Sequence, residues 1–176
     1  RTSISSSSPT SSTCSATVDP VVSLDQARFD AMWGEDSFAL ADYYDLLARD
    51  AFGNFRQLME DVSLHPAMGV YLSMLGNQKP DPVRNIRPDE NYARELMQLF
   101  TVGLVELNAD GTPRKDPQGQ PIPTYDQSII EGFAHVYTGW NWSGAATFGQ
   151  ARPSLQNQVL PMQAYAEQHD TGAKKI

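Results

Sequence analysis

Apolar and polar residues separate most cleanly along one stretch of the chain, residues 87–103. Projected at about 100° per residue, its apolar side chains fall on one arc and its polar side chains on the other. The apolar arc holds Tyr92, Ala93, Leu96, Met97, Leu99 and Phe100, and the polar arc holds Glu90, Asn91, Arg94, Glu95 and Gln98. The pattern predicts a helix over residues 89–102 that buries its apolar arc among neighbouring helices.

Similar periodicity predicts five further helices. Asn54 can cap one of them and Asp36 another, while Pro66 suits the first turn of a third. Thr124 and Gln127 have the spacing of a capping box for the last. These helices are expected near residues 24–33, 36–52, 54–63, 66–76 and 125–138. The helix near 66–76 should bury a stripe of Met68, Tyr71, Leu72 and Leu75.

One β excursion interrupts the helices. Residues 104–107 alternate like a strand, residues 108–111 form a turn, and the Pro- and Gly-rich stretch to Pro123 favours a long irregular hairpin. Beyond Trp142 the periodicity is lost. The predicted class is therefore mainly α, an irregular multi-helix bundle with one small β-hairpin excursion.

Composition divides the chain into three parts. Residues 1–20 are read as a disordered Ser/Thr-rich tail or linker, because they offer almost nothing to bury. Residues 21–142 form the expected helical core, and residues 143–176 an irregular, incomplete C-terminal segment.

Charge and cysteine content exclude several classes of protein. The 176 residues carry a formal net charge of -8, which argues against binding to nucleic acid. No apolar run reaches the roughly 20 residues that a membrane-spanning helix requires. Cys14 is the single cysteine, so no internal disulfide and no cysteine-rich metal site is expected.

Four sequence runs carry a resemblance to a known family. They are H-P-A-M-G-V-Y-L at 65–72, D-E-N-Y-A-R-E-L-M-Q-L-F-T-V-G at 89–103, T-Y-D-Q-S-I-I-E-G-F-A-H-V-Y-T-G-W at 124–140 and Q-H-D-T-G-A-K-K-I at 168–176. In this order, the runs resemble the core of a bacterial family, domain of unknown function 1800, over residues 37–176. The resemblance implies a largely helical, exported bacterial protein, of which this chain is an internal piece.

The polar arc of the helix at 89–102 supplies the main candidate functional residues, Glu90, Asn91, Arg94 and Glu95. Glu90 and Arg94 stand at i,i+4, where they can pair, as do Asn91 and Glu95. The planar guanidinium of Arg94 could hold a carboxylate or phosphate, and the two carboxylates could bind metal or transfer protons. The alternative is an ordinary solvated helix face.

Three histidines are candidate ligands. His65 precedes Pro66 and is most simply a helix-start residue bonded to the backbone, and His135 lies inside a predicted helix as a satisfied, partly buried side chain. His169 and Asp170 could bind metal only with partners from elsewhere in the chain. No pair has the H-E-x-x-H spacing of zinc hydrolases.

Other metal and ligand motifs are weaker. A composite site of His65, Glu90 and Glu95 is conceivable, but no metal and no cofactor is assigned. The run from Glu106 imitates half of a calcium loop, yet Pro117 stands where the bidentate Glu is needed. Trp140 and Trp142 could stack on a sugar ring, although core packing is favoured.

The expected role is non-catalytic: ligand binding, or surface or envelope assembly, by a protein exported to the periplasm, cell surface or medium. Partners would be a protein, the remainder of the same domain, a small molecule or a glycan. The alternative is a metal-assisted hydrolase or oxidoreductase built around Glu90, Arg94, Glu95 and His65, with its site completed by residues beyond Ile176.

Overall fold

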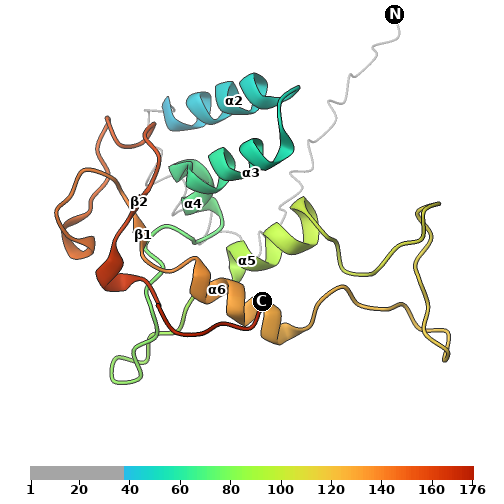
Figure 1. The fold of residues 1–176 in the computed structure, drawn as a ribbon. Helices are drawn as coiled ribbons and strands as arrows, with labels where there is room; N and C mark the ends of the chain where they lie inside the picture. Colours follow the sequence, from blue (N-terminus) through green and yellow to red (C-terminus); the bar gives the residue numbers. More distant parts are fainter. Residues whose placement is uncertain (1–37) are drawn as a thin grey trace, which may run out of the picture. The chain divides into compact units, whose positions relative to one another are not determined.

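The computed structural model describes residues 38–176, all of which lie in one compact unit, Glu35–Ile176. The expected tail at 1–20, the helix at 24–33 and the cap Asp36 lie outside the described residues. The described elements, in order, are α2 (Phe38–Asp50), α3 (Phe55–Leu64), α4 (Pro66–Tyr71), α5 (Asn91–Glu95), the π-helical turn η1 (Leu96–Phe100), α6 (Gln127–Val136), β1 (Trp140–Asn141), the 3-10 turn η2 (Phe148–Gln150), β2 (Gln163–Ala164) and the 3-10 turn η3 (Ala166–Gln168) (Figure 1).

Each helix expected within the described residues is present, with ends that differ by a few residues. Helices nevertheless account for less than half of the described residues, so the mainly-α prediction holds only in part. The strands β1 and β2 pair antiparallel, with Trp140 opposite Ala164, and were not expected. No helix in the described part of the chain is long and apolar enough to cross a membrane.

The expected irregular β excursion is present, as a meander held by isolated bridges. Residues 104–123 leave η1, turn twice and return to α6 (Figure 1). Isolated antiparallel bridges join Val105 to Pro123, Leu107 to Pro113 and Lys115 to Pro121. Since proline cannot donate a backbone hydrogen bond, a proline in each bridge keeps the pairing from growing into longer strands.

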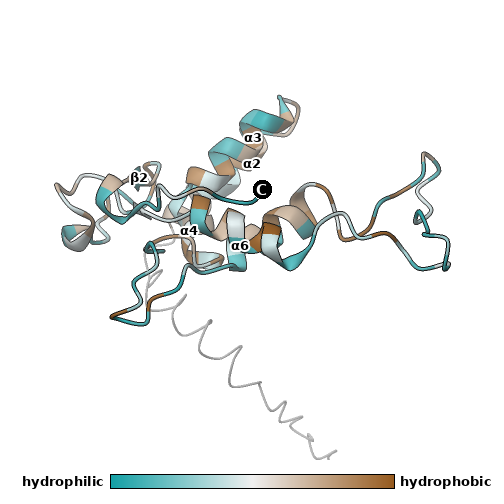
Figure 2. Ribbon diagram, turned by 60° about the horizontal axis from the view of Figure 1, so that its bottom comes forward, coloured by the Kyte–Doolittle hydropathy of each residue, from teal (hydrophilic) through white to brown (hydrophobic). Residues whose placement is uncertain are grey.

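Local capping explains where α3 and α4 begin. The side chain of Asn54 accepts a hydrogen bond from the backbone N–H of Arg56 at 2.9 Å, as predicted for a helix cap. Pro66 stands in the first turn of α4, where its missing N–H costs nothing. Along α3, hydrophilic residues are interspersed with more hydrophobic ones, as expected of a helix with one buried face (Figure 2).

Helix α4 is shorter than predicted. It ends at Tyr71 because Ser73 adopts a left-handed backbone, φ 60°, and the N–H of Leu75 bonds back to the carbonyl of Gly69. The predicted buried stripe is wrong at Tyr71, whose side chain is 67% exposed, whereas Met68 and Leu72 are buried.

The signature helix forms, but its second half is wider than an α-helix. The π-helical turn η1 follows α5 directly and adds a residue to the turn, which changes the direction of the side chains after it. The 100° projection consequently fails for Leu99, which is 67% exposed. Tyr92 and Met97 are buried as predicted, while Leu96 and Phe100 pack partly buried against the core.

The predicted capping box at Thr124 is wrong. Asp126 caps α6 by accepting a hydrogen bond from the N–H of Ile129. Thr124 is unavailable because its hydroxyl donates to the carbonyl of Gly103, at the base of the meander. Gln127 also faces away from the cap and reaches the carboxylate of Glu90.

Two hydrophobic clusters form the core. One gathers buried residues of α2, α3, α4 and α5 with Met162 from the irregular C-terminal segment, and the other packs α5 and η1 against α6. Tyr137 contacts both clusters, and its ring meets the ring of Tyr92 edge-on at 4.9 Å between centroids. Tyr137 therefore joins the two halves of the core.

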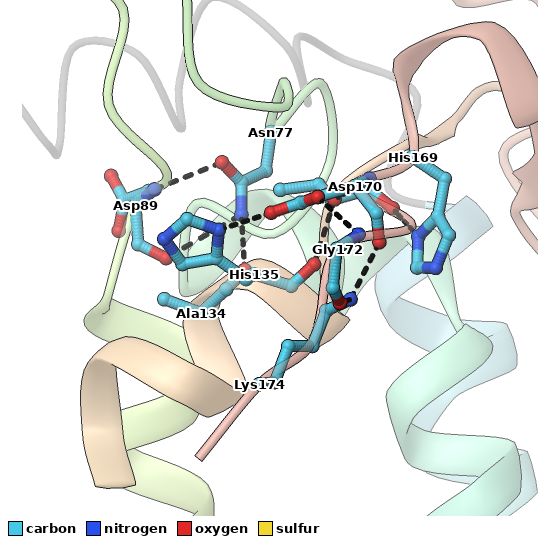
Figure 3. Close-up of polar contacts among 9 residues, drawn as sticks. Asn77, Asp89, Ala134, His135, His169, Asp170, Gly172 and Lys174 are labelled. Atoms are coloured by element: carbon cyan, nitrogen blue, oxygen red, sulfur yellow. Dashed lines mark hydrogen bonds and ion pairs between the residues drawn. The ribbon is translucent and has the colours of Figure 1, made fainter. Parts of the chain in front are cut away.

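A buried asparagine, Asn77, links the loop before α5 to the end of α6 (Figure 3). Its side-chain oxygen accepts from the N–H of Asp89 at 2.9 Å, and its amide nitrogen lies 3.4 Å from the carbonyls of Asp89, Ala134 and Tyr137. Its own carbonyl accepts from the N–H of Gly139 at 2.8 Å. The start of α5 and the end of α6 are thus held by one side chain.

Replacing Asn77 should destabilise the fold more than replacing an exposed amide side chain does. We expect Asn77→Ala to lower the free energy of unfolding by about 2–3 kcal/mol, because it leaves buried backbone groups without partners. Thermal and urea unfolding measure the change, with exposed Gln118→Ala as the matched control. Equal stability of the two variants would contradict the linking role of Asn77.

Candidate functional site

The predicted polar face forms a surface network rather than a pocket. Arg94 pairs with Glu90 at 2.8 Å, and the amide of Gln127 donates to the same carboxylate at 2.9 Å. Both charged side chains are more than a third exposed, so the pair contributes little to stability. Asn91 is exposed, Glu95 is half-buried, and none of the four residues lines the cleft described below.

His65 is a structural helix cap. Its Nδ1 accepts the backbone N–H of Ala67 at 3.1 Å, which places the proton of the neutral ring on Nε2, where it donates to Asp42 at 3.1 Å. The side chain is 4% exposed, and both nitrogens are in use. Burial lowers the pKa of His65, and hydrogen bonding to Asp42 opposes that effect.

The composite metal site of His65, Glu90 and Glu95 is not formed. His65 is bonded to Asp42 of α2, whereas Glu90 is bonded to Arg94 on its own helix. Among residues 38–176, no three His, Cys, Asp or Glu side chains gather where they could hold a metal ion.

The C-terminal segment brings Asp170 to His135, which the sequence predicted to be satisfied and partly buried without naming its partner. His135 Nδ1 lies 2.5 Å from Asp170 Oδ2 (Figure 3). The N–H of Gly172, and secondarily the His135 ring, lower the pKa of Asp170, so this carboxylate stays ionised. A carboxylate accepts at this nitrogen, so Nδ1 carries the proton and Nε2 of the neutral ring has the lone pair.

His169, like His135, is oriented by a hydrogen bond that its Nδ1 donates, but to a different kind of partner. Its Nδ1 donates to the backbone carbonyl of Thr138 at 2.9 Å, since a carbonyl oxygen can only accept. The neutral ring consequently has its lone pair on Nε2. The sequence indicates both His169 and Asp170 as candidate metal ligands, but they have different surroundings: Asp170 bonds to His135, while His169 lines a cleft.

This cleft has a volume of about 560 Å³. Its walls come from the C-terminal turn of α3, the C-terminal end of α6, and the paired strands β1 and β2. The residues that line it are Glu60, Ser63, Leu64, Met74, Val136, Tyr137, Thr138, Trp140, Ala164 and His169. Volumes of this size accommodate small organic ligands.

Some polar groups of the cleft already have hydrogen-bond partners within the protein, and others do not. The hydroxyl of Ser63 contacts both the carbonyl of Met59 and the hydroxyl of Tyr92, each at 2.5 Å. Within the described part of the chain, Nε2 of His169 has no hydrogen-bond partner. Glu60 is exposed at the rim. Burial raises the pKa of Tyr137, so its phenol stays protonated.

Gly139 allows the two sides of the cleft to approach each other. Its φ is +87°, and a Cβ at this position would lie 2.8 Å from the backbone nitrogen of His169 and 2.9 Å from the carbonyl oxygen of Tyr165. The carbonyl of Gly139 accepts from the N–H of Tyr165 at 2.8 Å. The segment that carries His169 can therefore pack directly on the end of α6.

The two tryptophans after α6 have separate positions. Trp142 is 4% exposed, so it is a core residue and offers no face to a sugar. Trp140 is partly buried and lines the cleft. Sequence reasoning named His169 and Trp140 but missed Glu60 and Ser63, because both sit in a helix with ordinary amphipathic periodicity.

The comparisons with known proteins identify a family. A family model described as "Protein of unknown function (DUF1800)" matches residues 29–176. This match confirms the resemblance seen in the sequence. No curated protein and no solved structure matches the chain.

His65 should make stability depend on pH. The pKa of His65 in the folded chain lies below the ordinary 6.5, so between these two values the unfolded chain binds more protons than the folded chain. The stability that the neutral ring contributes above pH 6.5 is therefore lost as the pH falls through the native pKa. His65→Asn keeps a capping side chain without titrating. Denaturant unfolding between pH 8 and pH 5 should show the free energy of unfolding falling more steeply in the parent than in His65→Asn. Parallel plots of this free energy against pH would contradict the assignment.

Gly139→Ala should displace His169. A left-handed backbone costs a non-glycine residue roughly 1–2 kcal/mol, and the added Cβ also meets the His169 backbone. We expect a lower melting temperature and shifted NMR resonances of the His169 ring. In Gly149→Ala the added Cβ meets nothing within 4 Å, so this control should change neither.

Proposed function

The chain belongs to the DUF1800 family, and we propose that it is a non-catalytic segment that binds a small organic ligand in the cleft at His169. One observation carries the proposal: His169 lines the cleft with its Nδ1 fixed to the carbonyl of Thr138, leaving Nε2 as an acceptor. An oriented polar group in a mostly apolar cleft is the usual composition of a ligand site.

The residues around this acceptor support binding. Met74, Val136 and Leu64 supply apolar wall, and Trp140 and Tyr137 supply aromatic surface. These side chains can remove the body of a ligand from water while His169 fixes its orientation. The predicted polar face lacks such an enclosure, because Glu90 and Arg94 are committed to each other at the surface.

Export from a bacterial cell is part of the same proposal. It rests on the Ser/Thr-rich composition of residues 1–17 and on the character implied by the family resemblance. A role in surface or envelope assembly would follow if the ligand were a component of the envelope. Fractionation of cells that produce the natural protein tests this point: a purely cytoplasmic fraction would contradict it.

Ligand binding is tested by screening the purified chain against a small-molecule and glycan library. We expect bound compounds to shift the indole N–H resonance of Trp140, with Trp142 unaffected because it is buried outside the cleft lining. His169→Gln should weaken binding about tenfold or more, as expected when an oriented hydrogen bond is lost. Binding that persists unchanged in His169→Gln would place the ligand elsewhere.

An enzyme remains the alternative, and the His135–Asp170 pair is the observation that favours it. A histidine whose Nδ1 is held by a carboxylate presents Nε2 as a proton acceptor, as general bases do. The test is metal analysis and a hydrolase assay of the full-length natural protein. Activity lost in His135→Gln, or bound metal lost in Glu95→Gln, would replace the non-catalytic proposal.

A further inference from the structure

The charge of the cleft restricts which ligands it can accept. Among the described residues that line it, Glu60 is the one with a permanent charge, and no Lys or Arg is present. An anionic ligand would leave its charge without a counter-ion beside this carboxylate, whereas a cation would gain one.

Aromatic rings reinforce this preference. Tyr137 and Trp140 line the same cleft, and the face of an aromatic ring attracts a cation electrostatically, most strongly for tryptophan. The Tyr137 phenol is neutral, so it adds ring surface without adding charge. Carboxylate and rings together form the kind of lining that recognises organic ammonium groups.

His169 supplies the remaining polar contact. Its Nε2 can accept a hydrogen bond from a hydroxyl or an N–H of the ligand. The occupied hydroxyl of Ser63 is less available, because it already contacts Met59 and Tyr92. A ligand with an ammonium group and a nearby hydroxyl would satisfy both Glu60 and His169.

We propose that the cleft binds an organic ammonium compound, with Glu60, Tyr137 and Trp140 receiving the cationic group and His169 accepting a hydrogen bond from the ligand. This assignment rests on the proposed ligand-binding function and specifies its ligand class. Apolar residues such as Val136 line the same cleft and cover part of the alkyl groups of the cation, which strengthens the electrostatic attraction.

Three isosteric probes test the assignment at pH 8: choline, the neutral 3,3-dimethylbutan-1-ol and the anionic 3,3-dimethylbutanoate. We expect choline to bind about tenfold tighter than the neutral alcohol, and the anion to bind weakest, by NMR titration of the Trp140 indole. Equal binding of all three, tightest binding of the anion, or no binding of choline would overturn the proposal.

Variants separate the cation preference from a general loss of structure. Glu60→Gln changes an exposed rim residue, so it should fold normally, and it should reduce the preference for choline over the neutral alcohol from about tenfold to about threefold, because the two rings still attract the cation. Glu131→Gln removes an exposed carboxylate of α6 that does not line the cleft, and should leave all three affinities unchanged. An unchanged choline preference in Glu60→Gln would contradict the assignment.

The outcomes also distinguish the two proposals. If neutral or anionic compounds from the library bind at Trp140 while choline does not, the ligand class is wrong and the binding function stands. If no compound shifts the Trp140 resonance, both fail.

Discussion

The fold depends on one buried amide, because Asn77 supplies hydrogen bonds where the hydrophobic core cannot. The segments that meet there are irregular or terminal: the loop before α5, the last turn of α6 and Gly139. Backbone groups at such ends have no partner within their own element, and burying them unpaired is costly. A side chain that both donates and accepts satisfies several of them, and in doing so fixes α5 against α6.

The cleft is a consequence of that arrangement. Once the end of α6 is held, Thr138 can present its carbonyl to His169, and its hydroxyl accepts from the N–H of Asp170 at 2.8 Å. Gly132 lets the C-terminal residues around Lys175 lie along α6, because a Cβ at position 132 would be 1.8 Å from the carbonyl oxygen of Lys175. The C-terminal segment, although irregular, is therefore anchored along its length and carries His169 to the site.

The two candidate functions of this molecule, catalysis and ligand binding, depend on two different histidines, His135 and His169. His135 and His169 each use Nδ1 as a donor, one to a carboxylate and the other to a backbone carbonyl. Only His169 opens on the cleft with apolar and aromatic walls, whereas His135 does not line it. Our proposal of ligand binding rather than catalysis rests on this difference in surroundings, not on a difference in histidine chemistry.

The sequence alone determined the features that depend on neighbouring residues: the helical periodicity, the cap at Asn54 and the cap at His65 before Pro66. It located the signature helix and the β excursion, but it could not foresee the π-helical turn that exposes Leu99. The pairing of Asp170 with His135 and the cleft around His169 were decided by tertiary structure. The partners lie 35 residues apart in the His135–Asp170 pair and 31 apart in the Thr138–His169 bond. Such contacts follow from packing, which has no periodic signal in the sequence.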